Sequence, residues 1–540
     1  MHHAGVIRAS WLLLAVSVGA LGACSEEEAS LSTDSGAATA GDSGKPSTTD
    51  AGVKGGIDGG SSEEVASRPD GGGGVIDGAA AALMTAVLPT PEKQSGPEAT
   101  GVCEAMVDEA ACDRTKLPIV FVHGTVANAD SFAHPAKLFT SNGYCSDRIT
   151  GIEYHSLIAG PPSDAGAFVL DREATYAAAK KAIDEEIARI RTELGPTAKV
   201  DLAGHSQGAG HGARYVGENP DKVAHYINLA GGMLTSDPGG VPTLNLSSVG
   251  DRPVDAGTTK SVIIPDQWFD HSAVSSATEA FVEMYKFLND GAEPKYTTVQ
   301  CGSPILLEGK AQTFAENAVL PNSKVEIYEL DPTKPATERG EPVASYTLSA
   351  SSKFGPFTAK PGVAYEFKLI PPADDTTRRP ARAYLPPFVR SDRLLRFNFE
   401  TKDPVAAATS GQVNRDPSFA VIIPRSRQKA FLAERDSLSV DGKEIISRAN
   451  TLTQAPGTGM VRSAVTVAYY LYDKSLTSSF GPGDGKSTLE SIIRGSFVNS
   501  ADLFIPAATP KFIDVKFNGK TLKVPNWPSS TEGASVVFLN

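Results

Sequence analysis

Ser206 lies at the centre of the pentapeptide Gly204-His205-Ser206-Gln207-Gly208, which has the pattern G-x-S-x-G. A segment that we read as a strand, residues 200–203, precedes it, and a segment with helical periodicity follows. In that context the pattern predicts a sharp turn that exposes the serine hydroxyl at a helix N-terminus, where the helix dipole favours negative charge. Side chains at the two flanking glycines should collide with neighbouring elements, and Gly210 and Gly212 should let the helix approach the sheet closely. The sequence therefore predicts Ser206 as a nucleophile.

A second glycine turn, His123-Gly124-Thr125, closes an apolar β-branched segment at residues 119–122. A loop in this place can aim the backbone N–H of Thr125 at a carbonyl oxygen, together with the N–H of Gln207. Two such donors would form an oxyanion hole, and each contributes roughly 3–4 kcal/mol in the transition state. Because His123 precedes the glycine, we expect it to support the loop rather than to act as a base.

The general base can be narrowed by elimination, because the last of the nine histidines is His271. In α/β-hydrolases the chain order is Ser, then acid, then His, which leaves only His211, His225 and His271 after Ser206. The first lies one turn along the predicted helix, and the second lies at the entrance of a strand. His271 follows the last predicted strand and precedes the closing helix, so it is the predicted base. The adjoining Asp270 should face solvent, because neighbouring side chains of an extended chain point apart.

The acid of the triad is predicted at Asp251, at the exit of a strand expected at residues 243–247. The acid usually lies in the loop after the strand that follows the one at residues 226–229, and the strand at residues 243–247 is in that position. Asp255 and Asp237 remain open as alternatives. Such a triad performs acyl transfer in two steps with its own side chains, so no cofactor is expected.

Strands alternate with helices around these residues, from about residue 98 to residue 298. Strands are expected at residues 119–122, 200–203, 226–229 and 243–247, and helices at residues 171–194, 208–215 and 279–288. This alternation predicts an α/β domain with a mostly parallel sheet that is covered by helices on both faces.

After about residue 300 the apolar period changes to two, as at residues 365–369. The dipeptides Asp441-Gly442 and Asn518-Gly519 are typical of two-residue hairpin turns. These patterns predict a small β-sandwich at residues 299–372 and a second, mostly β domain at residues 373–540, which we expect to bind lipid or substrate.

The N-terminus has the features of an export signal. Arg8 precedes an apolar segment at residues 11–21, which is too short to span a bilayer, and the sequence Leu-Gly-Ala-Cys that ends at Cys24 resembles the lipobox of bacterial lipoproteins. It predicts a signal peptide at residues 1–24, a lipid on Cys24, and delivery to the outer membrane or cell surface, or release outside the cell. A plain secretory signal is the alternative. Residues 25–97, rich in Gly, Ser, Ala and Asp, predict a disordered tether.

Four further cysteines, Cys103, Cys112, Cys145 and Cys301, suggest two disulfides in an exported chain. A bond between Cys103 and Cys112 closes a short loop and would leave Cys145 to pair with Cys301. No histidine lies at ligand spacing beside them, so no metal site is predicted. The net charge of −13 argues against nucleic acid as a partner. The expected partners are a lipid ester substrate and, through the anchor, a membrane.

With these motifs in place, the chain from about residue 117 to residue 290 resembles the small bacterial triacylglycerol lipases. The matching segments are residues 118–124, 199–208, 223–232, 246–254 and 269–272. The resemblance implies the same five site residues, namely the triad of Ser206, Asp251 and His271 and the oxyanion donors Thr125 and Gln207.

The chain from residue 117 to residue 540 also looks like an archaeal-type lipase with a C-terminal lipid-binding β domain. The segments that carry this resemblance are residues 385–392, 499–507 and 524–527. In that architecture the acid follows the strand at residues 226–229, where this chain has Ala230, and the departure supports Asp251. Only residues 155–170 are available for a lid, so strong interfacial activation is not expected.

The predicted function is hydrolysis of carboxylic esters of lipids through an acyl-enzyme. The short lid leaves a polyester depolymerase or a feruloyl-type esterase open as an alternative. The segment at residues 299–372 is similar to the transthyretin-like β-sandwiches of secreted enzymes, which suggests binding rather than chemistry. A surface binding protein with a vestigial hydrolase domain is a further alternative, but a decayed site would have lost one of its residues first.

Overall fold

A computed structural model shows the architecture of the chain. It describes residues 105–161, 169–248, 257, 259–265, 269–402, 418–433, 435–446, 466–473, 491–494, 498–508 and 511–539. All of these residues lie in one compact unit. The predicted signal peptide, Cys24, the tether, Cys103 and Asp251 lie outside the described residues.

Six strands of the described residues form a parallel sheet in the order β3-β2-β4-β5-β6-β7. They are β2 (Ile119–Val122), β3 (Ile149–Gly151), β4 (Val200–His205), β5 (Val223–Leu229), β6 (Thr243–Ser248) and β7 (Lys260–Ile264). β3 lies on one side of β2 and β4 on the other, so the strand order reverses at β2. Sites in open parallel sheets form at the carboxyl ends of strands at such a reversal. His123 follows β2 there, and Ser206 follows β4.

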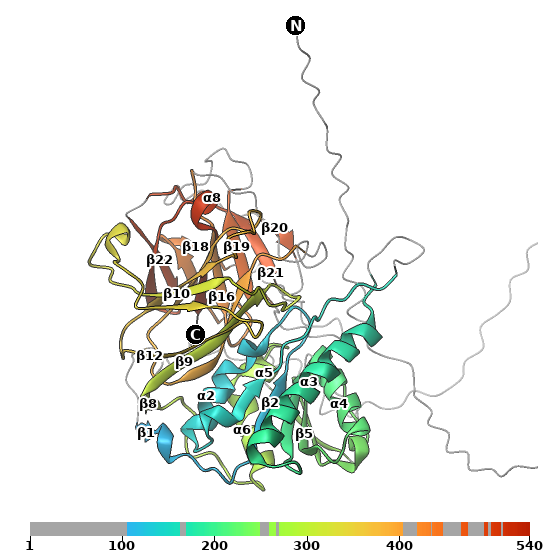
Figure 1. The fold of residues 1–540 in the computed structure, drawn as a ribbon. Coiled ribbons are helices and arrows are strands. Elements are labelled where there is room, and N and C mark those ends of the chain that lie inside the picture. The colour runs from blue at the N-terminus through green and yellow to red at the C-terminus, as the bar shows by residue number, and fades with distance from the viewer. Residues whose placement is uncertain are drawn as a thin grey trace, which may run out of the picture. The chain divides into compact units, whose positions relative to one another are not determined.

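Helices cover both faces of this sheet (Figure 1). One face carries α3 (Arg172–Leu194) and α4 (Gln207–Glu218), and the other carries α2 (Ala133–Ser141), α5 (Ala273–Ser276) and α6 (Thr278–Leu288). The alternation of side chains along β2 explains both layers, because Val120 and Val122 pack toward α3 and α4 while Ile119 and Phe121 pack toward α2 and α6. The predicted α/β-hydrolase fold is confirmed.

The other described strands form mixed and antiparallel sheets. A nine-stranded sheet of the described residues contains, in order, β11 (Ala344–Thr347), β10 (Lys324–Glu329), β13 (Tyr365–Ile370), β14 (Ala381–Leu385), β24 (Ser535–Leu539), β16 (Ile422–Ser426), β19 (Ala468–Tyr472), β21 (Val498–Asp502) and β20 (Ser491–Arg494). A three-stranded sheet contains β12 (Lys353–Ala359), β9 (Ile305–Thr313) and β15 (Asp392–Phe399). A four-stranded sheet contains β18 (Lys443–Glu444), β17 (Leu438–Val440), β22 (Phe512–Phe517) and β23 (Lys520–Pro525). A two-stranded sheet pairs β1 (Met106–Asp108) with β8 (Cys301–Ser303). The short helices are η3 (Glu109–Ala111), η4 (Ala129–Phe132), η5 (Ser146–Arg148), η6 (Pro238–Gly240), η7 (Ala336–Glu338) and α8 (Ser529–Glu532).

Two apolar cores hold these sheets together. Leu307 of β9 and Phe397 of β15 pack against Phe367 of β13 in one core, and residues of β17, β22 and β23 pack against the nine-stranded sheet in the other. The C-terminal β-sandwich character of the predicted fold is thereby confirmed. The nine-stranded sheet runs across residue 372, because β13 pairs with β14, so the segments expected at residues 299–372 and 373–540 share one sheet. We refer to residues 301–539 as the β region.

The disulfide prediction is wrong. Cys112 is bonded to Cys145, with their Cα atoms 5.0 Å apart. This bond joins the segment before β2 to the segment before β3, two neighbouring strands that end in the same part of the sheet. Cys301 is also disulfide-bonded, to a partner outside the described residues. The short loop between Cys103 and Cys112 was a poor guide, because pairing follows the proximity that the fold creates.

Within the described ranges, no helix combines the length and the apolar character that crossing a membrane would require.

Candidate active site

The turn between β4 and α4 has the strained geometry that the G-x-S-x-G pattern predicts. Ser206 adopts φ 55° and ψ −122°, a conformation that residues with side chains rarely populate. A Cβ atom on Gly204 would lie 2.4 Å from the carbonyl oxygen of Gly208, and one on Gly208 would lie 2.2 Å from that of His123. The turn is fixed from outside because the N–H of Ser206 donates to the carbonyl oxygen of Leu229 at 2.8 Å.

The helix after the nucleophile begins at Gln207, so its positive end lies at the site. Gln207 is the first residue of this helix, and the first N–H groups of a helix have no intrahelical partner, which fits the predicted role of its N–H as an oxyanion donor. A Cβ atom on Gly212 would lie 2.8 Å from the ring of Tyr226, whereas the space beside Gly210 is open. Close approach of this helix to the sheet therefore needs Gly212 but, contrary to expectation, not Gly210.

The loop after β2 passes directly beside the nucleophile. A Cβ atom on Gly124 would lie 3.0 Å from the Cβ of Ser206. Thr125 lines the same cavity as Ser206, and Val126 has a φ of 60° with its N–H bound to the Oγ of Ser156 at 2.9 Å. Residues 123–128, which we call the oxyanion loop after the donor predicted at Thr125, thus lie beside Ser206, and the donor role of Thr125 remains a prediction.

His271 lines the same cavity as Ser206, so the structure brings the predicted base and nucleophile together. The carbonyl oxygen of His271 accepts a hydrogen bond from Nε2 of His205 at 2.8 Å, and the two ring centroids lie 4.7 Å apart. His205 therefore ties the base loop to the nucleophile turn. Sequence reasoning gave His205 no role, because its partner lies 66 residues away.

Asp270 does not face solvent, which corrects the prediction. It is only 2% exposed, and one carboxylate oxygen accepts the N–H groups of Ser272 and Ala273, both at 2.9 Å. The other oxygen accepts the N–H of Ala430 at 3.0 Å. Burial raises the pKa of Asp270. Its carboxylate is buried because three backbone donors replace water, and it connects the base loop to the β region.

The acid of the triad remains a prediction, because Asp251 and Asp255 lie outside the described residues. β6 ends at Ser248 and β7 begins at Lys260, so Asp251 belongs to the connection that follows the expected strand. Asp237 is exposed.

The remaining histidines of the domain have other partners. Burial lowers the pKa of His211 to about 4, which leaves its ring neutral at pH 7. Nδ1 of His225 lies 2.8 Å from a carboxylate oxygen of Asp201, and this hydrogen bond raises the pKa of His225. Neither histidine lines the cavity beside Ser206.

A cavity of about 210 Å³ opens beside Ser206 and His271. Its opposite wall comes from the β region and includes the apolar side chains Phe314, Phe397, Phe399, Ile423, Val536 and Phe538. Apolar walls with a few convergent polar groups are typical of ligand pockets. The sequence did not reveal these residues, because they come from strands far apart in the chain.

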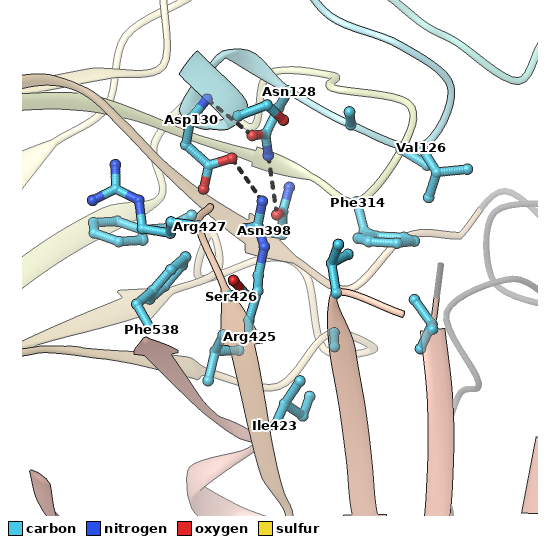
Figure 2. A pocket seen from close by; sticks show the side chains of 18 of the residues that line it. Val126, Asn128, Asp130, Phe314, Asn398, Ile423, Arg425, Ser426, Arg427 and Phe538 are labelled. Atoms are coloured by element: carbon cyan, nitrogen blue, oxygen red, sulfur yellow. Dashed lines mark hydrogen bonds and ion pairs between the residues drawn. The ribbon is translucent and has the colours of Figure 1, made fainter. Parts of the chain in front are cut away.

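A polar bridge joins the two walls of this cavity (Figure 2). The guanidinium of Arg425, on β16, lies 2.6 Å from a carboxylate oxygen of Asp130, on η4. Beside it, Nδ2 of Asn128 lies 3.5 Å from Oδ1 of Asn398. Asp130 is only 1% exposed, and burial raises its pKa. The bridge therefore places a guanidinium and a carboxyl group in the lining of the cavity, which also includes Arg427.

Residues 303–402 match the family of lipase C-terminal domains. A comparison with curated proteins gave no match. Together with the parallel sheet and the nucleophile turn, the match confirms the resemblance to α/β-hydrolase lipases.

Several solved structures are similar to parts of this chain. One is an extracellular α/β-hydrolase from a Paenibacillus species, which is 21% identical over 21% of this chain and 39% of that chain, with a TM-score of 0.15. A methylesterase from Arabidopsis is 15% identical over 32% of this chain and 99% of that chain, with a TM-score of 0.23. Aspergillus fumigatus lipase B is 12% identical over 34% of this chain and 55% of that chain, also with a TM-score of 0.23. The chain spans about two fifths of the length of the first of these, 39%.

Proposed function

We propose that the chain hydrolyses carboxylic esters of the lipid class, with Ser206 as nucleophile and His271 as general base. The observation that carries the proposal is the strained turn at Ser206, which shares one cavity with His271 and with Thr125 of the oxyanion loop. Strain of this kind persists only where the surrounding structure enforces it, and it is concentrated at functional sites.

In the proposed reaction, His271 takes the proton of Ser206 as the hydroxyl attacks the ester carbonyl. The negative charge that develops on the carbonyl oxygen is stabilised by the N–H groups of Thr125 and Gln207. The alcohol leaves with the proton from His271, and water activated by the same imidazole releases the acid from the acyl-enzyme. Asp251 orients the imidazole and stabilises its protonated form.

The substrate class rests on the cavity wall and on the lipase C-terminal domain. The aromatic and aliphatic side chains opposite the nucleophile offer an apolar surface to an acyl chain, and burying each CH₂ group contributes about 0.8 kcal/mol. Esters with longer acyl chains should therefore bind more tightly until the cavity is filled.

Replacing the nucleophile tests the proposal. Ser206→Ala removes one oxygen atom, so the protein should fold while turnover of p-nitrophenyl butyrate falls by about six orders of magnitude. Ser131→Ala is a matched control, because Ser131 lines the same cavity but is assigned no role. A fluorophosphonate probe should label the wild type and the control, and leave Ser206→Ala unlabelled. Retention of more than a few per cent of activity by Ser206→Ala would contradict the proposal.

A further inference from the structure

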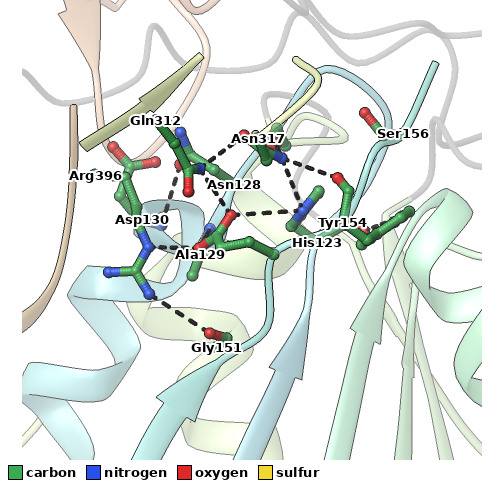
Figure 3. Close-up of polar contacts among 12 residues, drawn as sticks. His123, Asn128, Ala129, Asp130, Gly151, Tyr154, Ser156, Gln312, Asn317 and Arg396 are labelled. Atoms are coloured by element: carbon green, nitrogen blue, oxygen red, sulfur yellow. Dashed lines mark hydrogen bonds and ion pairs between the residues drawn. The ribbon is translucent and has the colours of Figure 1, made fainter. Parts of the chain in front are cut away.

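The oxyanion loop is held by a side chain from the β region (Figure 3). Nδ2 of Asn317 lies 3.0 Å from the carbonyl oxygen of Ala127, 3.1 Å from that of Tyr154 and 3.2 Å from Nε2 of His123. Asn317 is only 8% exposed. One amide group thus contacts both ends of the oxyanion loop and the neighbouring strand exit.

Asn317 is presented by a turn that follows β9. Asn317 and Ala315 both have left-handed backbones, with φ of 53° and 62°. The N–H of Asn317 donates to the carbonyl oxygen of Thr313 at 3.2 Å, and that of Phe314 donates to Phe399 at 3.1 Å. The turn is therefore fixed from the side of the β region, within the segment that matches lipase C-terminal domains.

The orientation of the amide is also set by the β region. Nε2 of Gln312 donates to Oδ1 of Asn317 at 2.7 Å and to a carboxylate oxygen of Glu153 at 3.0 Å. The other oxygen of Glu153 accepts from Arg396 on β15 and from the N–H of Ala129. Because Gln312 occupies the oxygen of the Asn317 amide, the NH₂ group must face the loop.

Through His123 and Tyr154, the contacts of Asn317 extend to Gln207, the second residue expected to supply an oxyanion donor. Nδ1 of His123 lies 2.8 Å from the carbonyl oxygen of Gly124, so it carries the proton, and Nε2 accepts from Asn317. The His123 ring stacks on Tyr154 at 4.4 Å. The hydroxyl of Tyr154 donates to the carbonyl oxygen of His123 at 2.7 Å and contacts the Gln207 side chain at 3.2 Å. The network therefore contacts the side chain of Gln207 and holds the loop at His123 and Ala127, on either side of Thr125.

We propose that Asn317 is a positioning residue, which fixes the oxyanion loop and so makes the β region necessary for catalysis on every ester, including small soluble ones. The inference rests on the proposed function, because it assumes that the loop stabilises an oxyanion. It differs from a role in binding lipid, which would affect only substrates that reach the β region.

A positioning role has a distinct kinetic signature. Displaced donors weaken the interaction with the charged transition state but leave the neutral ester unaffected, so kcat falls while KM stays unchanged. An alkyl boronic acid, which forms a negatively charged tetrahedral adduct with the nucleophile, should lose affinity by the same factor as kcat. A merely structural role would lower the amount of folded protein. It would change neither the kcat of the folded protein nor its affinity for the boronic acid.

The experiment compares Asn317→Gly with Asn322→Gly in the full chain. Both positions have left-handed backbones, with φ of 53° and 67°, which glycine adopts without strain. Asn322 is exposed, so its variant controls for the backbone change. With p-nitrophenyl butyrate, Asn317→Gly should lower kcat by about 10- to 100-fold, below the 10²–10³-fold that follows removal of a whole donor. Its KM should stay within about twofold, and the boronic acid should lose affinity in proportion to kcat. Asn322→Gly should match the wild type.

Wild-type kcat and boronic acid affinity in a folded Asn317→Gly protein would overturn the inference, as would a fall in kcat without loss of boronic acid affinity. If this variant does not fold, Asn317→Asp keeps the acceptor for Gln312 and loses the donor, and the same criteria apply. A failure of the proposed function itself would look different, because the wild type would then show neither turnover nor labelling of Ser206 by a fluorophosphonate.

Discussion

As the proposed base, His271 needs a partner that fixes its tautomer and stabilises its protonated form, and Asp251 is the predicted partner. Asp251→Asn keeps the shape of this partner and removes its charge, so turnover at neutral pH should fall by about four orders of magnitude. Asp237→Asn is the matched control. Asp237 is exposed, and a surface charge interacts weakly through water, so its variant should stay within about threefold of the wild type. Both are assayed on one soluble ester, and a near-normal rate for Asp251→Asn would assign the acid elsewhere.

Local pattern and chain order were enough to select Ser206 and His271 as candidates that the structure brings to one cavity, because the nucleophile turn has a sequence signature and few histidines remained. The supporting residues could not be predicted in this way. The partners of His205, Asn317 and Asp130 lie 66, 190 and 295 residues away in the chain, and no local pattern encodes such distances.

One segment that carried the resemblance to archaeal-type lipases has a structural explanation. Arg390, in residues 385–392, is only 1% exposed. Its guanidinium donates to the carbonyl oxygen of Thr140 at 2.7 Å and to that of Gln300 at 3.1 Å. In the same segment, Asp392 pairs with Arg427 at 2.9 Å. Arg390 therefore fastens the hydrolase domain to the β region, whereas the Asp392–Arg427 pair lies within the β region.

Two glycines of α4 differ in what a methyl group would meet. On Gly208 it would lie 2.2 Å from the carbonyl oxygen of His123, whereas on Gly210 it would meet open space. Gly208→Ala should therefore displace the oxyanion loop and lower activity by at least about 100-fold, or prevent folding. Gly210→Ala should keep full activity and gain about 0.5–1 kcal/mol in the free energy of unfolding, because alanine favours helix.

Thermal unfolding and the rate on a soluble ester, measured for both glycine variants, check this expectation. A fully active Gly208→Ala protein would show that the turn and the loop are farther apart than the structure places them.

At the level of elements, the hydrophobic periodicity predicted the buried strands and their covering helices well. Both hairpin turns are confirmed, since Asp441-Gly442 and Asn518-Gly519 have positive φ angles and connect paired strands. β7 (Lys260–Ile264) was missed, because its first two residues are polar and exposed. Periodicity identifies a strand from the alternation or the continuous burial of its own residues, and this edge strand shows neither over its whole length.

Over the whole molecule, the pairing of strands in the β region was beyond prediction. β24, near the end of the chain, lies between β14 and β16 and is parallel to both. β15 pairs in parallel with β9, which lies about 80 residues earlier in the chain. Such pairings depend on which surfaces meet after long loops close. The expectation of a separate unit at residues 299–372 came from the period-two apolar pattern, which identifies strands but not the strands they pair with.

The same long-range contacts bring Asp130 and Arg425 together across the cavity, one from each side of the molecule. Burial raises the pKa of Asp130, even though the Arg425 guanidinium acts to lower it and Arg427 adds a smaller effect in the same direction. A carboxyl group whose pKa is raised by folding binds more protons in the folded state than in the unfolded state. Its contribution to stability therefore falls as pH rises from the unfolded pKa to the folded one.

Arg425→Met removes the main cation and leaves the buried carboxyl group of Asp130 in place. The pKa of Asp130 should rise further, so the variant should lose more stability relative to the wild type at pH 8 than at pH 5. Between the pKa of Asp130 in the folded wild type and its higher pKa in the folded variant, the difference in stability between the two proteins can grow by at most about 1.4 kcal/mol per pH unit. The double variant Asp130→Asn, Arg425→Met has no carboxyl group at this position to titrate, so its difference from the wild type should lack this increase.

Thermal midpoints of the three proteins at pH 5 and pH 8 give the measurement. An equal loss for Arg425→Met at both pH values would mean that removing Arg425 does not change the protonation of Asp130 between pH 5 and pH 8, which would contradict the expected rise in its pKa.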